Sequence, residues 1–241
     1  VQVEGAIVDP IERTSIRYRC RVDAYAGSPH VGLVHTFTYL GTDPLLAITE
    51  YSLEFLTSLG ATAVRNEEGG QGFWSTAEFG GDRAPLRGIT RLDQHSAGEY
   101  RTYRRDASAG KGTRARGWVS LGSDHSLLLA VKDFWQQYPK GLSLTTSGFK
   151  VSLWNGPEPF DADLGLAKTH QLTLSVAAAG NAREQALAQL DNPLFGIAPA
   201  DWYCATRGLG VLAPYSLAKY PQFETEIEAA ADLMARERPY G

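Results

Sequence analysis

The sequence predicts a mainly β protein, an antiparallel β-sandwich followed by a short C-terminal helical segment. Three observations lead to this fold class: polar and hydrophobic side chains alternate in many short segments, glycine-containing turns separate these segments, and helical spacing appears only near the end of the chain. A parallel sheet is disfavoured because the crossover helices that parallel strands need are missing. We therefore expect a β-sandwich domain over residues 1–178 and a helical segment over residues 179–241.

The clearest strand is predicted over Thr14–Ala24, where hydrophobic and charged residues alternate and would occupy opposite faces of a sheet. Val31–Leu40 is rich in β-branched and aromatic residues, which favour the next strand. The later strands are predicted over Leu45–Leu56, Thr62–Arg65, Gly88–Asp93, Glu99–Arg104, Gly117–Leu121, Ser126–Phe134, Ser143–Thr146, Val151–Trp154 and Lys168–Ser175.

Two loops and three helices complete the prediction. Glu67–Arg83 holds five glycines in a short span, which indicates a loop. Asp106–Arg116 is small, polar and basic, which indicates a loop. Helices are expected over Asn181–Leu190, Ala200–Leu209 and Phe223–Arg238. The last of these is acidic at its start and basic at its end, as the helix dipole favours.

Composition excludes several classes of partner. There are 23 basic and 27 acidic residues, and a net charge of −4 gives no support to nucleic-acid binding. No run of about eighteen apolar residues appears, so we expect no membrane-spanning helix. The two cysteines, Cys20 and Cys204, are too far apart in sequence to indicate a zinc site or a disulfide framework.

We expect no cofactor and no metal, although one acidic loop leaves calcium open. Glu158, Asp161 and Asp163 offer the hard oxygen ligands that calcium takes. They lack the spacing of an EF-hand, so a solvated acidic loop is the interpretation that we favour.

Three residues are candidates for catalysis. Lys168 and His170 are two positions apart, so an extended chain places both on one face. Their proximity would lower the tendency of each to carry charge, which suits a general base near neutral pH. The alternative is a polar outer strand face. His35 lies within a strand, with Phe37 and Tyr39 on its face, and could serve either the sheet or a cleft.

The segment DFWQQYPKG, residues 133–141, combines aromatic, amide and cationic side chains. Trp135 and Tyr138 could stack on sugar rings, while Gln136 and Lys140 could bind sugar hydroxyl groups. The alternative is that the aromatic residues fill the core of the sandwich.

This segment, the strand around Trp154 and the segment GLAKTHQL occur in an order that resembles the exo-acting rhamnogalacturonan lyase family. His35-Thr36-Phe37 and the sequence from Pro199 to Tyr203 fit the same order, and the resemblance covers about residue 10 to about residue 215. Members of the family have an N-terminal barrel, a central β-sandwich and a C-terminal α/α toroid. The resemblance therefore implies a fragment comprising the sandwich and the start of the toroid, without the N-terminal and C-terminal domains of a parent chain.

The resemblance also implies β-elimination on an acidic pectic polysaccharide, such as rhamnogalacturonan, by a secreted or periplasmic enzyme. His170 would serve as base or acid, and Lys168 would neutralise the uronate carboxylate. His35 is the further candidate for a catalytic role. We expect the isolated chain to be a poor catalyst compared with the parent. Two alternatives stay open: a non-catalytic carbohydrate-binding or scaffold module, and a sugar epimerase with a mutarotase-like supersandwich.

Overall fold

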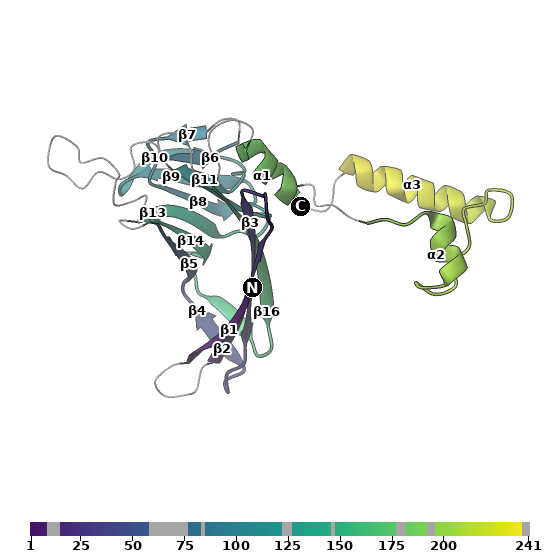
Figure 1. Cartoon of the computed structure of the whole chain (residues 1–241), viewed down its shortest axis with the longest axis horizontal. Helices are drawn as coiled ribbons and strands as arrows, with labels where there is room; N and C mark the ends of the chain where they lie inside the picture. Colours follow the sequence, from purple (N-terminus) through teal and green to yellow (C-terminus); the bar gives the residue numbers. More distant parts are fainter. Residues whose placement is uncertain are drawn as a thin grey trace. The chain divides into compact units, whose positions relative to one another are not determined.

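The computed structural model describes residues 1–8, 15–57, 77–82, 85–121, 127–145, 148–176, 182–191 and 196–237 (Figure 1). The chain forms two compact units, Val1–Pro193 and Leu194–Gly241. Antiparallel strands dominate the first unit and a long helix lies in the second, which confirms the predicted fold class. The strand predicted over Thr62–Arg65 lies outside the described residues.

The larger sheet contains eight strands among the described residues, each antiparallel to its neighbours. In spatial order they are β1 (Gln2–Val8), β2 (Ser15–Ala24), β3 (His30–Tyr39), β16 (Ala167–Val176), β12 (Leu127–Val131), β11 (Trp118–Leu121), β6 (Glu78–Gly80) and β7 (Pro85–Arg87). The pairing of β3 with β16 brings the two predicted histidine-containing segments side by side.

The second sheet contains six described strands, again all antiparallel. In spatial order they are β10 (Ala107–Gly112), β9 (Glu99–Arg104), β8 (Arg91–Ser96), β13 (Lys140–Thr145), β14 (Gly148–Trp154) and β5 (Tyr51–Leu56). A short ribbon pairs β15 (Phe160–Asp163) with β4 (Leu45–Ile48).

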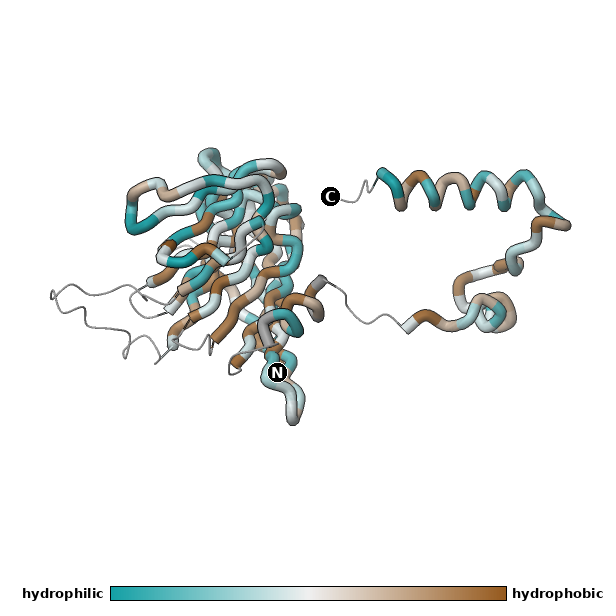
Figure 2. Tube along the Cα trace, turned by 90° about the horizontal axis from the view of Figure 1, so that it is seen from above, coloured by the Kyte–Doolittle hydropathy of each residue, from teal (hydrophilic) through white to brown (hydrophobic). Residues whose placement is uncertain are grey.

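The two sheets share one hydrophobic core. Phe37 and Leu172 from the larger sheet lie in the same buried cluster as Leu142, Phe149 and Val151 from the smaller one. Figure 2 shows the alternation of hydrophobic and hydrophilic residues along these strands. A sandwich follows, because each sheet has one apolar face and the two apolar faces cover each other.

Three segments predicted as loops contain strands instead. Glu78–Gly80, within the expected loop Glu67–Arg83, forms β6. Ala107–Gly112, within the expected loop Asp106–Arg116, forms β10 and pairs with β9 at the edge of its sheet. Most of β10 is exposed, so backbone hydrogen bonds rather than an apolar face hold it in place. Asp161 and Asp163 of the acidic loop belong to β15, and no group of three or more metal-ligating side chains occurs among the described residues.

The first helix, α1 (Ala182–Asp191), belongs to the β unit. Its Ala186, Leu187 and Leu190 share a buried cluster with Trp118 and Leu128 of the larger sheet. This second, smaller core lies on the face of β11 and β12 opposite the main core. Because this helix packs on the sheet, the compact unit extends to Pro193. The sequence had predicted a boundary at residue 178.

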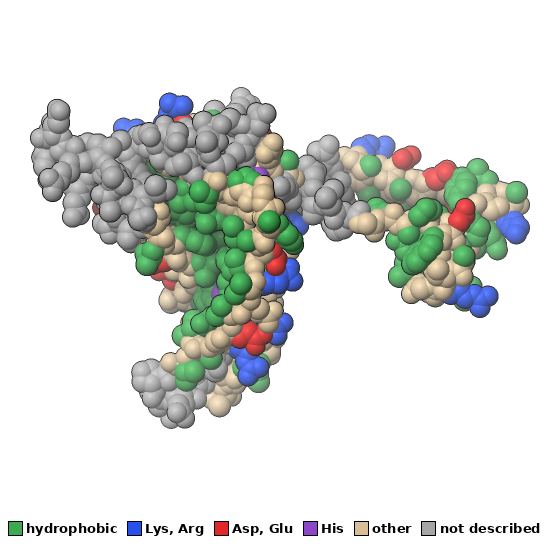
Figure 3. Space-filling view, viewed as in Figure 1, with side chains coloured by type: hydrophobic (Ala, Val, Ile, Leu, Met, Phe, Trp, Pro, Cys, Tyr) green, Lys and Arg blue, Asp and Glu red, His purple; other side chains and the backbone are tan. Residues whose placement is uncertain are grey.

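The second unit contains α2 (Ala200–Thr206) and α3 (Pro221–Glu237). Both helices carry exposed apolar side chains, among them Trp202, Phe223 and Ile227, and Figure 3 shows hydrophobic side chains gathered on this unit. None of the helices in the described part of the chain is long and apolar enough to cross a membrane.

Candidate functional site

Strand pairing places three of the predicted residues on the inner face of the larger sheet. His170 of β16 lies directly opposite His35 of β3, and Lys168 lies opposite Phe37. Residues two apart share a face, so Lys168, His170 and His35 all belong to the face that also carries the core residue Leu172. The exposed fraction is 1% for His170 and 3% for His35.

Lys140 reaches the same region from the other sheet. It begins β13 and shares the face of Leu142, which is part of the main core. Lys140 is fully buried, and its Nζ donates a hydrogen bond to Gln137 Oε1 at 2.8 Å. We call His35, Lys140, Lys168 and His170 the interior base cluster.

Burial lowers the pKa values of the interior base cluster, and repulsion between its charged forms adds to this effect. Burial and, to a lesser degree, the charge of Lys168 lower the pKa of Lys140 to about 7, whereas Asp133 acts in the opposite direction. Burial lowers the pKa of His170 to about 2, assisted by the charges of Lys140, Lys168 and His35. Burial also lowers the pKa values of Lys168 and His35.

Tyr51 of β5 completes this region. Its hydroxyl lies 2.8 Å from His35 Nε2, and its ring lies 4.6 Å from that of Phe37 between centroids. Burial raises the pKa of Tyr51 to about 12, so its hydroxyl keeps its proton at neutral pH. The pair can therefore present either a neutral acceptor or a hydroxyl donor to a bound molecule.

The two ring nitrogens of His170 are buried and have no hydrogen-bond partner among the described residues. Buried polar groups in native proteins are nearly always satisfied, so an unsatisfied imidazole requires an explanation. A neutral imidazole has one donor and one acceptor, and a bound ligand with oxygen atoms would satisfy both.

A small cavity adjoins the interior base cluster at Lys168. Its lining consists of Phe37, Ile48, Tyr51, Leu153, Trp154, Phe160 and Lys168. The indole Nε1 of Trp154 is buried and has no hydrogen-bond partner in the part of the chain that the structure describes. The cavity thus combines aromatic walls with the Lys168 amine and the Tyr51 hydroxyl, and it has room for about one water molecule.

The predicted sugar-contacting residues are not all in this region. Lys140 is in the interior base cluster, but Gln136 and Tyr138 are exposed in the turn that precedes β13. Trp135 is partly buried, and the Arg114 guanidinium lies 4.1 Å above its ring. This cation–π contact occupies one ring face that the sequence analysis assigned to a sugar.

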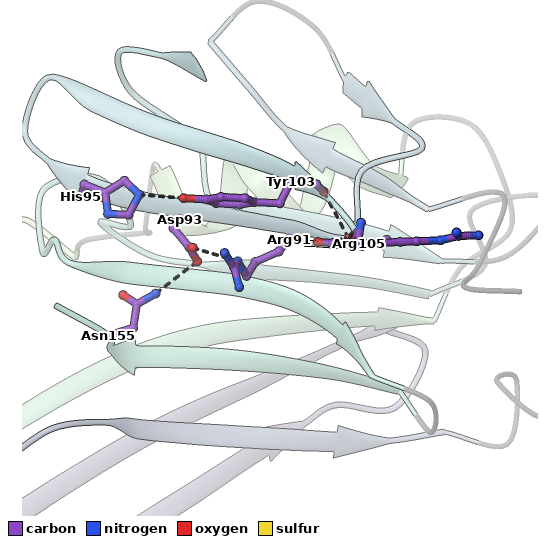
Figure 4. A network of polar contacts seen from close by, with 7 residues as sticks. Arg91, Asp93, His95, Tyr103, Arg105 and Asn155 are labelled. Atoms are coloured by element: carbon purple, nitrogen blue, oxygen red, sulfur yellow. Dashed lines mark hydrogen bonds and ion pairs between the residues drawn. The ribbon is translucent and has the colours of Figure 1, made fainter. Parts of the chain in front are cut away.

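A polar network lies on the opposite, outer face of the smaller sheet (Figure 4). Asp93 of β8 accepts a hydrogen bond from Asn155 Nδ2 at 3.1 Å and pairs with Arg91 Nε at 3.0 Å. Burial raises the pKa of Asp93, although the neighbouring Arg91 charge lowers it in part. His95 Nε2 and the Tyr103 hydroxyl lie 3.4 Å apart in the same network.

The sequence analysis missed Tyr51, Trp154 as a cavity residue, and Asp93. Tyr51 alternates with Leu53 and Phe55, and this signal could have placed it on the buried face of its strand. Asp93 gave no such signal, because its burial depends on Asn155, which is distant in sequence.

Comparisons with known proteins give one distant structural neighbour to report. No family model matches the chain, and a search of curated proteins found no match. The crystal structure of a proposed aldose 1-epimerase from Klebsiella pneumoniae subsp. pneumoniae MGH 78578 is 11% identical, with a TM-score of 0.34. The match covers 80% of this chain and 55% of that chain, so this chain spans about half the length of that neighbour.

Proposed function

We propose that the interior base cluster binds an acidic sugar residue of a polysaccharide and catalyses its cleavage by β-elimination. The observation that carries the proposal is a concentration of four nitrogen bases with which no carboxylate of the described residues pairs. Such a site is complementary to an anionic ligand, because a carboxylate would raise the lowered pKa values and restore favourable charge pairs.

The reaction requires three groups. A cation must neutralise the uronate carboxylate, so that the proton on the adjacent carbon becomes acidic. A base must remove that proton, and its electron pair then forms the carbon–carbon double bond while the bond to the glycosidic oxygen breaks. An acid must finally protonate the departing oxygen.

The electrostatics suggest which side chain takes each role. Lys168 lines the cavity and would pair with the carboxylate, while neutral His170 would donate its N–H to the same group. Lys140 would remove the proton, because a pKa of about 7 suits proton transfer at neutral pH better than that of His170, about 2. Tyr51 keeps its proton and would donate it to the departing oxygen.

The substrate that we propose is a pectic polysaccharide such as rhamnogalacturonan. The resemblance of the sequence to the exo-acting rhamnogalacturonan lyase family supports this choice. The aromatic lining of the cavity also supports a sugar as the ligand, since Trp154 and Phe160 pack at a tilt of 42° with their ring centroids 4.9 Å apart and offer it apolar ring surface.

The test is to incubate the protein with rhamnogalacturonan and to follow the ultraviolet absorbance of the conjugated unsaturated product. We expect absorbance to rise with the wild-type protein and not with Lys168→Met, which keeps the length of the side chain but removes its charge. Arg17→Met, at an exposed position on β2, is the matched control. Binding of the polymer without product would instead indicate a carbohydrate-binding module.

A sugar epimerase is the second candidate, and one observation favours it. His35 and His170 lie side by side on one face of the paired strands β3 and β16, and burial lowers the pKa of both, so the pair could exchange protons with a neutral sugar. Epimerisation changes optical rotation without producing ultraviolet absorbance. The measurement is the optical rotation of a freshly dissolved aldose. If the wild-type protein accelerates its change and His35→Gln does not, the epimerase function is favoured over the lyase function.

A further inference from the structure

The outer-face network touches the backbone beside Lys140. Gly141 lies opposite Asp93 in the pairing of β13 with β8 and opposite Ser152 in the pairing with β14. A Cβ on Gly141 would lie 2.6 Å from Asp93 Oδ1 and 2.7 Å from Asn155 Nδ2. The hydrogen bond between Asp93 and Asn155 therefore passes directly over Gly141, which only a glycine permits.

The same segment also touches the residue on the other side of Lys140. Gly156 follows Asn155, and a Cβ on Gly156 would lie 3.1 Å from Pro139 Cγ. Pro139 and Gly141 are the immediate neighbours of Lys140 in the chain. The segment after β14 thus packs against both flanks of Lys140, while its own position is tied to β8 through Asp93.

We propose that Asp93 and Asn155 are positioning residues, which hold the start of β13 so that Lys140 points into the interior base cluster. We call their hydrogen bond over Gly141 the outer clamp. The role of the outer clamp in turnover depends on the proposed function, whereas its effect on the position of Lys140 does not.

Burial of a lysine amine requires close packing of the backbone that carries it. The amine of Lys140 donates a hydrogen bond to Gln137, and its flexible side chain could otherwise turn towards water. A shift at Gly141 would open this route. Lys168 and Asp133, the other groups that act on the Lys140 amine, lie outside the outer clamp and would stay unchanged.

The experiment follows the Lys140 side chain by NMR in protein carrying 13C-labelled lysine, with the Lys140 signal assigned from Lys140→Arg. In the wild-type protein we expect the Cε signal to titrate near pH 7. Gly141→Ala pushes apart Asp93 and Asn155, and Asn155→Ala removes the donor. We expect both substitutions to raise the pKa of Lys140 by at least about one unit, towards the ordinary value for lysine.

Two control variants separate positioning from general destabilisation. Gly98→Ala makes the same substitution at a turn glycine whose Cβ would meet no atom within 4 Å, and should leave the titration unchanged. Asp93→Asn keeps the Oδ1 acceptor for Asn155 and should titrate close to the wild-type protein. Circular dichroism shows whether each variant is folded. If Gly141→Ala does not fold, the test depends on Asn155→Ala.

A Lys140 signal that titrates as in the wild-type protein in folded Asn155→Ala would overturn the proposal. The titration needs no substrate, so absence of lyase activity in the wild-type protein would reject the proposed function and leave the outer clamp standing. Where elimination is observed, we expect Asn155→Ala to reduce kcat more than it raises KM, because Lys168 and the cavity lining remain in place.

Discussion

The buried amine of Lys140 should impose a pH dependence on the reaction. Lys140 accepts a proton only when it is neutral, and its pKa is lowered to about 7. We therefore expect kcat/KM for elimination to rise with pH up to about 7 and then to level off. Lys140→Met should abolish elimination. His170→Gln should slow elimination, but kcat/KM should still increase with pH up to about 7. An unchanged rate between pH 5 and pH 8 would show that Lys140 is not the base.

His170 should make the protein sensitive to acid. The unfolded chain gains a proton on His170 as pH falls through 6.5, whereas the folded protein resists it down to about pH 2. The unfolded state therefore binds more protons between these values, and stability rises with pH there by about 1.4 kcal/mol per pH unit for one such group.

His170→Gln removes this titration, so the free energy of unfolding of the variant should depend less steeply on pH. The measurement is urea denaturation at pH 5 and at pH 6 for both proteins. His35 is also buried but is present in both, so its contribution cancels in the difference. Equal slopes for the two proteins would mean that His170 is protonated in the folded state.

The composition of the interior base cluster could be predicted only in part. Lys168 and His170 share a face because strands have a period of two, and this spacing is visible in the sequence. The inward direction of Lys140 depends on how the second sheet packs on the first, and local sequence does not contain that information. A lysine beside exposed aromatic residues therefore suggested a surface contact, whereas Lys140 is fully buried.

At the scale of elements, close packing of β5 on β14 depends on Gly148. A Cβ on Gly148 would overlap the carbonyl oxygen of Phe55 on the neighbouring strand. Backbone atoms cannot rotate away, so Gly148→Ala must separate the strands, and we expect a loss of about 2 kcal/mol or more. This pairing also holds Tyr51 opposite Trp154, so the cavity should be disturbed as well.

Gly32→Ala in β3 is the matched control, because the nearest atoms to its Cβ would lie at 3.8 Å, an ordinary contact distance. We expect it to change the free energy of unfolding by less than about 0.5 kcal/mol, as most unstrained substitutions do. Thermal denaturation of the two variants provides the comparison. Equal stability would mean that β5 and β14 are not packed as described.

Strands with an apolar face were predictable, and strands without one were not. Alternation identified β2 and β3 almost to the residue, because burial of one face imposes the pattern. β10 is polar and rich in glycine and was taken for a loop, although its backbone pairs with β9. Its pairing comes from the neighbouring strand rather than from its own side chains.

At the scale of the whole molecule, the described core residues indicate where an independent unit ends. Every residue of both buried hydrophobic clusters lies before Pro193, the last residue of the first compact unit. The outer clamp and the interior base cluster lie there too. We therefore expect a chain ending at Pro193 to fold with nearly unchanged stability of the β unit and with the same Lys140 titration.

A chain ending at Val176 should behave differently, because it lacks α1. Leu187 and Leu190 would no longer cover Trp118 and Leu128, and each buried leucine contributes about 1.5–3 kcal/mol. We expect this shorter chain to lose several kcal/mol relative to the chain ending at Pro193, measured by urea denaturation of both. Equal stabilities would place the domain boundary near residue 178, as the sequence suggested, and would make α1 part of the helical segment rather than of the sandwich.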